Sequence, residues 1–195
     1  MTELKRVSAA SAALLLIGLA GAGVSSAAAA ARTRNAVVMR AFAVSQVDPA
    51  CKPVLAANYK TLDTPNHMYT DHPGGDGKRA TGELITINGE RYVQIKGAWR
   101  KSPMNVAATK AQEEENIKDA KVLSCKQTGN DTVNGEAATV YTEHTENDET
   151  KSDGKIWVSK SRGVILKEEL VLDTGDGTKQ QVSTRYEYGN VKAPI

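Results

Sequence analysis

Two stretches of the chain repeat apolar residues at the spacing of an amphipathic helix. The first runs from Asp48 to Pro65, and its apolar positions are Cys51, Val54, Leu55, Tyr59 and Leu62. Asp48 can cap this helix with Pro49 at the first helical position. The second stretch, residues 102–121, carries glutamates at 113–115. Most of this second helix is therefore expected to face water, with a weak apolar stripe resting on a sheet.

Elsewhere beyond residue 66 the apolar residues alternate with polar ones, which predicts β-strands. The expected strands are residues 67–71, 83–88, 90–96, 122–128, 137–145, 155–160, 164–172 and 180–188. Asn88-Gly89 tolerates the positive φ angles of a two-residue turn, so the strands beside it should pair antiparallel. The pattern predicts an α+β domain, a curved antiparallel sheet (half-barrel) of about seven or eight strands covered on one side by two helices.

The sequence from Glu90 to Arg100 predicts a β-strand with one apolar face and one polar, solvent-exposed face, called here the wet face. The apolar face is expected to carry Val93, Ile95, Gly97 and Trp99. The wet face is expected to carry Tyr92, Gln94, Lys96 and Arg100. This interpretation treats the segment as one continuous strand with a period of two.

The N-terminal end has the layout of a secretory signal peptide, with basic residues, an apolar run and then small residues. Residues 1–30 are therefore expected to be a signal peptide, cut between Ala27 and Ala31. Its apolar run is shorter than the ~20 residues of a membrane span, so no permanent span is expected after cleavage. Residues 31–47 are interpreted as a leader of uncertain order, and residues 48–195 as one domain in the periplasm.

The chain has two cysteines, Cys51 and Cys125, and both lie in the part expected to be exported. Export favours a disulfide between them, and a free pair is the alternative. The 25 basic and 23 acidic residues leave a net charge of only +2. Basic residues are interleaved with glutamates, so no nucleic-acid partner is expected.

Two patterns bear on catalysis or metal binding. His67 and His72 flank Asp71, but two residues five apart in a strand point to opposite faces, so no metal site is expected. Asp173-Thr174-Gly175 matches the motif around the carboxylate of aspartic proteases, whose mechanism needs two such aspartates. One copy is present, and a polar turn explains the same residues. An unrecognised hydrolase therefore remains only a remote alternative, and no cofactor or catalytic residue is expected.

Several segments resemble a known group of proteins. They are Ala98-Trp99-Arg100-Lys101-Ser102-Pro103-Met104, Glu113-Glu114-Glu115-Asn116, Gly154-Lys155-Ile156-Trp157-Val158-Ser159-Lys160 and Arg185-Tyr186-Glu187-Tyr188. The chain resembles small exported bacterial proteins of unassigned function, whose sheet is similar to that of the outer-membrane lipoprotein-carrier (LolA-like) superfamily. The resemblance covers roughly residues 48–194. It implies an incomplete antiparallel barrel that holds acyl chains or lipid between sheet and helices.

The sequence therefore predicts a non-enzymatic cell-envelope protein that holds a lipid or acyl chain between sheet and helices. The residues expected to line this site are Val93, Ile95, Trp99, Leu170, Leu172, Val182 and Tyr186. The alternative is an envelope interaction or scaffold protein in which the same residues pack against the helices and fill the core. Its partner would be another envelope protein.

Overall fold

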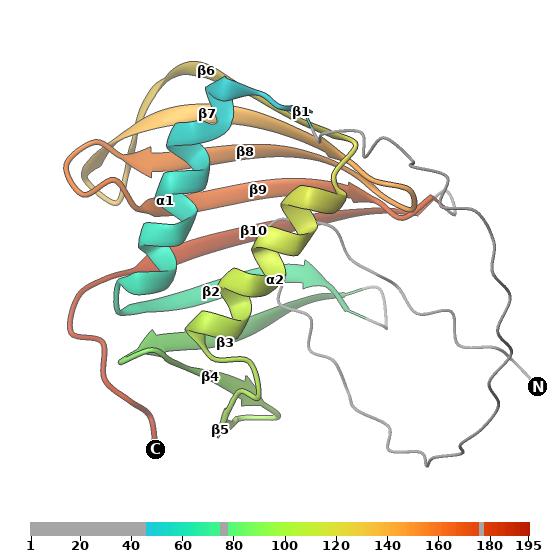
Figure 1. The fold of residues 1–195 in the computed structure, drawn as a ribbon. Helices are drawn as coiled ribbons and strands as arrows, with labels where there is room; N and C mark the ends of the chain where they lie inside the picture. Colours follow the sequence, from blue (N-terminus) through green and yellow to red (C-terminus); the bar gives the residue numbers. More distant parts are fainter. Residues whose placement is uncertain (1–45, 75–77, 176–177) are drawn as a thin grey trace, which may run out of the picture.

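A computed structural model describes residues 46–74, 78–175 and 178–195. The predicted signal peptide and all but the last two residues of the predicted leader lie outside these ranges. One open sheet carries two helices, α1 (Lys52–Asp63) and α2 (Val106–Asp119), on the same face. Figure 1 shows the two helices side by side across the sheet. In the described part of the chain, no helix is both long and apolar enough to cross a membrane.

The sheet contains ten strands in the order β1-β6-β7-β8-β9-β10-β2-β3-β4-β5. Their bounds are β1 Gln46–Val47, β2 Asn66–Pro73, β3 Arg79–Ile87, β4 Glu90–Ile95, β5 Ala98–Lys101, β6 Val122–Val133, β7 Glu136–Glu146, β8 Lys151–Ser159, β9 Ile165–Asp173 and β10 Lys179–Glu187. Nine strands pair antiparallel, whereas β1 pairs parallel with β6. The first and last strands of this order do not pair, so the sheet stays open.

The α+β class and the two helices on one side are confirmed, but the predicted count of seven or eight strands is wrong. One additional strand is β1, formed by the last two residues of the predicted leader. The other is β5, because Lys96 and Gly97 form a turn with φ angles of 51° and 78°. Positive φ at both positions is typical of the tight turn in a β-hairpin. The segment predicted as one strand is thus a hairpin of β4 and β5.

The start of α1 follows from its sequence. Asp48 accepts a hydrogen bond from the backbone N–H of Ala50 through its side chain, at 2.9 Å. It thereby caps a short 3-10 helix, η1 (Pro49–Cys51), that leads directly into α1. Cys51 at this junction forms the predicted disulfide with Cys125 on β6, with the two Cα atoms 4.9 Å apart. The disulfide therefore fixes the start of α1 to one side of the sheet.

The face of the sheet under the helices, called here the helix face, carries the main hydrophobic core. Val54 and Ala57 of α1 belong to one buried cluster with Ile156, Val158 and Ile165 of β8 and β9. Because side chains alternate along a strand, neighbouring Trp157 points to the opposite, outer face. There it joins a smaller cluster of Ala138, Val140, Val164 and Leu166.

Candidate functional site

The part of the helix face beneath α1 is filled by protein. Cys51, Val54 and Ala57 are at most 2% exposed, and α1 lies directly on β8 and β9. Thr61 of α1 accepts a hydrogen bond from the backbone N–H of Ile165 at 2.8 Å. This half of the helix face, called here the α1 half, is a packed core.

Six of the seven residues predicted to line a ligand site lie on the helix face, as the strand registers show. They are Val93 and Ile95 on β4, Leu170 and Leu172 on β9, and Val182 and Tyr186 on β10. Their surroundings differ. Val93 and Tyr186 pack with the main core cluster, whereas Ile95 is 36% exposed near the tip of the β4–β5 hairpin. Whether any of them binds a ligand stays a prediction.

The predicted position of Trp99 is wrong. Trp99 pairs across β4 and β5 with Gln94, and its ring contacts His67 edge-on at 5.7 Å between centroids. Both contacts lie on the outer face. The Lys96-Gly97 turn reverses the chain and resets the alternation, so Trp99 does not share a face with Ile95.

The other part of the helix face, called here the α2 half, is built differently. Leu170 and Leu172 are buried at 6% and 8% exposure, yet they belong to neither hydrophobic cluster. Val182 lies directly opposite Leu170 on β10 and is half-buried. The covering helix α2 has one fully buried residue, Val106, at its start. Helix α2 therefore contributes one fully buried apolar side chain, although Leu170 and Leu172 are themselves covered.

Three glutamates interact electrostatically in the region between the helices and the sheet, called here the seam. They are Glu113 on α2, Glu143 on β7 and Glu168 on β9. Glu168 accepts a hydrogen bond from the hydroxyl of Tyr186 at 3.0 Å, and Glu113 accepts one from the amide of Asn58 at 3.1 Å. Among the ion pairs of the described residues, none includes these three carboxyls.

Burial dominates the electrostatics of this carboxyl cluster. It raises the pKa of Glu168 to about 8, and that of Glu143 to about 7. Repulsion between the carboxylates adds to both shifts, because Glu143 and Glu113 each disfavour ionisation of their neighbours. Burial also raises the pKa of Glu113. Near neutral pH the cluster therefore holds protons that exposed glutamates would have lost.

The sequence analysis missed this cluster, although a signal for part of it exists. Glu168 alternates with Leu170 and Leu172, so a period of two places it on the buried face of β9. Glu143 likewise alternates with Tyr141 and Thr145 on β7. Glu113 gives no such signal, because it lies within a run of three glutamates.

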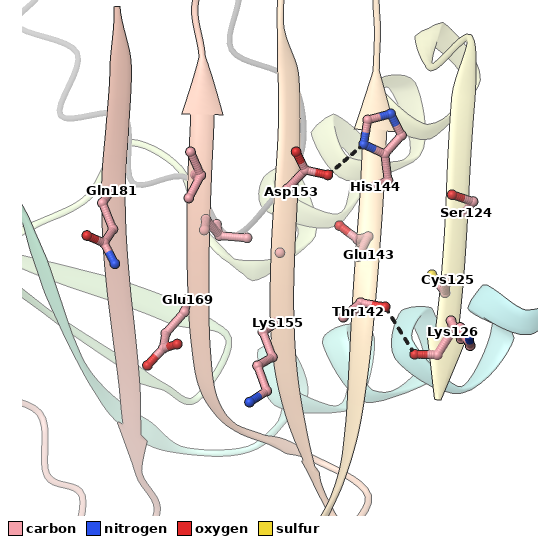
Figure 2. Close-up of a pocket in the computed structure, with 13 residues that line it drawn as sticks. Ser124, Cys125, Lys126, Thr142, Glu143, His144, Asp153, Lys155, Glu169 and Gln181 are labelled. Carbon is pink, nitrogen blue, oxygen red and sulfur yellow. Dashed lines mark hydrogen bonds and ion pairs between the residues drawn. The ribbon is translucent and has the colours of Figure 1, made fainter. Parts of the chain in front are cut away.

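A groove of about 580 Å³ lies on the outer face, across strands β6 to β10. Figure 2 shows Lys126, Asp153 and Lys155 among the side chains that line it, with the helices behind the strands. Its charged residues alternate in sign and include Lys126, His144, Asp153, Lys155 and Glu169. A hydrogen bond of 2.8 Å to Asp153 raises the pKa of His144. The groove offers charged groups of both signs and, at Val171, an exposed apolar side chain.

The other sequence patterns have structural explanations. His67 hydrogen-bonds Glu83 on the outer face, whereas His72 lies on the helix face, as its odd spacing predicted. Asp173 accepts a hydrogen bond from the backbone N–H of Gly175 at 3.0 Å, which is a polar turn. In the described ranges, no group of three or more His, Cys, Asp or Glu residues could hold a metal ion.

No protein-family model and no curated protein matches the sequence. The fold is similar to that of several solved structures. The lipoprotein LppX of Mycobacterium tuberculosis is 11% identical with a TM-score of 0.40, and the match covers 72% of this chain and 100% of LppX. Pseudomonas aeruginosa MucB, in its complex with MucA, is 13% identical with a TM-score of 0.45 over 74% of this chain and 59% of MucB.

A LolA superfamily protein from Nitrosomonas europaea, NE2245, is also similar to this chain. It is 8% identical with a TM-score of 0.28, and the match covers 71% of this chain and 91% of that protein.

Proposed function

We propose that the protein is an exported, non-enzymatic component of the bacterial cell envelope that holds an apolar or acyl chain between α2 and the sheet. The observation that carries this proposal is the contrast between the two halves of the helix face. Leu170 and Leu172 are buried outside both core clusters, beneath a helix with one buried residue. An alkyl chain placed beneath α2 would supply the apolar contacts that the helix does not.

The chemistry of the α2 half suits such a ligand. Leu170, Leu172 and Val182 form an apolar surface on neighbouring strands, and each methylene buried against it would contribute about 0.8 kcal/mol. The carboxyl cluster lies beside this surface, since Glu168 precedes Leu170 on the same face of β9. A ligand with an apolar chain and a polar head would match both parts.

Two observations support export. The pattern of residues 1–30 is typical of a signal peptide. Cys51 and Cys125 form a disulfide, and disulfides persist in oxidising compartments such as the bacterial periplasm.

Native mass spectrometry of protein purified from the envelope, followed by lipid extraction, tests the proposal. We expect a bound mass that is lost on extraction and restored by adding fatty acid. Val182→Phe should weaken rebinding, because the larger ring occupies space beneath α2. Val171→Phe is the matched control, because Val171 lies on β9 but points to the outer face and is 41% exposed. A ligand-free mass and no shift with fatty acids or lipopeptides would exclude the carrier function.

A second function is favoured by the outer face. The groove across β6 to β10 is open and combines charges of both signs with the exposed side chain of Val171, and such a mixed surface would suit a protein partner rather than a lipid. In that case the protein would be an envelope interaction or scaffold protein, and the α2 half would act only as core. Charge reversal at Lys126 and Lys155 would then abolish partner binding in the envelope, whereas Val182→Phe would leave it unchanged.

A further inference from the structure

Helix α2 is attached to the rest of the protein mainly by polar contacts. Arg91 of β4 donates a hydrogen bond to Thr109 at 2.7 Å, and Lys110 forms an ion pair with Asp63 of α1 at 2.6 Å. Further contacts are the hydrogen bond from Asn58 to Glu113 and the one from the backbone N–H of Val106 to Gly89. The apolar attachment of α2 consists of buried Val106, the partly buried Ile117 and, directly after the helix, buried Ala120. α2 itself buries one residue where α1 buries three, so α2 is held less firmly than α1.

The three glutamates of the carboxyl cluster lie where α2 meets the sheet. Glu113 belongs to the helix, whereas Glu143 and Glu168 belong to the sheet beneath it. Each influences the ionisation of another across the seam. When neutral, the three carboxyls are compatible with a closed seam. When ionised, they place like charges together in a region of low dielectric constant, which favours their separation.

Other titratable groups facing the cluster do not neutralise it. Tyr186 of β10 donates its hydroxyl to Glu168, and burial raises its own pKa well above the ordinary value. Tyr59 of α1 has a pKa raised by burial and by Glu114 and Glu113, so it stays neutral. Tyr188, after β10, has a pKa raised by burial and stays neutral as well. Arg91 interacts electrostatically with Tyr186, and its guanidinium donates a hydrogen bond to Thr109.

Proton linkage gives the direction of the effect. The carboxyls bind protons more tightly in the closed seam than in water, where a glutamate has its ordinary pKa of 4.5. The closed arrangement is therefore most stable relative to the open one below about pH 4.5. That stability is lost progressively as the pH rises through about 7 and about 8, the raised values of Glu143 and Glu168.

We propose that ionisation of Glu113, Glu143 and Glu168 releases α2 from the sheet, which makes the helix a lid that is closed in acid and opens in mild alkali. α1 does not follow, because the disulfide and the packed core hold it. The movement is a property of the protein alone and stands whether or not a ligand binds beneath the lid. Its failure would therefore leave the proposed ligand binding to be judged by its own experiment.

Hydrogen–deuterium exchange of the full chain, corrected for intrinsic exchange at each pH and reduced only at quench, tests the lid. Between pH 6 and pH 8.5 we expect the protection of α2 amides to fall by about tenfold or more, while β7, β8 and α1 keep theirs. The double variant Glu143→Gln/Glu168→Gln should lose most of this pH dependence, because Gln keeps the size and hydrogen bonds but cannot ionise.

Glu115→Gln is the matched control. Glu115 lies on the same helix but is exposed and pairs only with Lys118, so this variant should keep the wild-type pH dependence. A flat α2 protection in the wild type, or a double variant as steep as the wild type, would refute the lid.

The wild type alone provides a second measurement if the double variant does not fold. An NMR titration should show the side-chain carboxyls of Glu143 and Glu168 ionising near pH 7 to 8, with α2 amide shifts following the same midpoints. Carboxyls that ionise near pH 4.5, or α2 shifts that do not follow them, would overturn the proposal.

Discussion

The two helices cover neighbouring parts of the same sheet face, but they are attached by different physical means. α1 begins at a disulfide, buries Val54 and Ala57 against β8 and β9, and receives a backbone hydrogen bond from Ile165. α2 buries Val106 and carries Glu113, which interacts electrostatically with Glu143 and Glu168 of the sheet. One half is stabilised by apolar packing and a covalent bond, whereas the proposed lid makes the attachment of the other depend on protonation.

A half-barrel covered by helices must be stable, and part of it must be able to move. The two halves of the helix face divide these two requirements. The α1 half supplies stability, since dense packing and a closed loop of 74 residue steps resist unfolding. The α2 half can then be loosely packed without loss of the fold. Regions that move in function are drawn from the less stable parts of a protein, so α2 is the element expected to move.

The largest expected effect comes from removing the disulfide. The variant Cys51→Ala/Cys125→Ala should lose about 4 kcal/mol of unfolding free energy in urea titration, because the unfolded chain is no longer closed. Reduction of the wild type should give a similar loss. Hydrogen-exchange protection should fall most at the start of α1. An equal loss of protection in both helices would contradict the view that the disulfide stabilises mainly the α1 half.

A smaller effect should distinguish the packing of the two halves. Ile165→Ala removes a side chain that is 1% exposed within the main cluster, and should cost about 3 kcal/mol. Leu172→Ala on the α2 half should cost about 2 kcal/mol or less, because a loosely packed site collapses more easily. Equal losses in chemical denaturation would mean that the α2 half is as well packed as the α1 half.

The smallest effect concerns Gly154 on β8. An added Cβ there would lie 2.7 Å from Cδ2 of Leu170, so Leu170 must move. If space can open beneath α2, the leucine rotates and Gly154→Ala costs less than about 1 kcal/mol, compared with about 1–3 kcal/mol in a tight core. Gly129→Ala, where no atom lies within 4 Å of the added Cβ, is the control in the same thermal unfolding assay.

Much of the fold could be predicted from local pattern. Asn88-Gly89 forms the expected turn with positive φ at both residues, and Asn134-Gly135 has the same geometry. The Lys96-Gly97 turn has the same geometry, but Lys is a weaker turn signal than Asn, so β5 was missed and Trp99 was assigned to the wrong face. Two-residue β1 is too short to produce an alternation, and its pairing depends on β6, which is distant in sequence.

The candidate site was less predictable, because its character depends on which element covers which strand. Leu170, Leu172 and Val182 lie on one face of the sheet, which alternation along β9 and β10 can indicate. It could not show that Leu170 and Leu172 lie outside the core clusters, or that Glu113 of α2 meets Glu143 and Glu168 of the sheet. These properties arise from the tertiary position of α2, and the polar sequence of this helix indicates only that it is largely solvated.

The two margins of the sheet bear on how copies of the protein behave when crowded. At one margin β1 and the N–H of Asp48 pair with the beginning of β6, and the neighbouring disulfide keeps them there. At the other margin β5 is only four residues long and carries the exposed cations Arg100 and Lys101. Short, charged or covered margins oppose strand-to-strand stacking of copies. We therefore expect this open sheet to resist fibril growth even at high protein concentration.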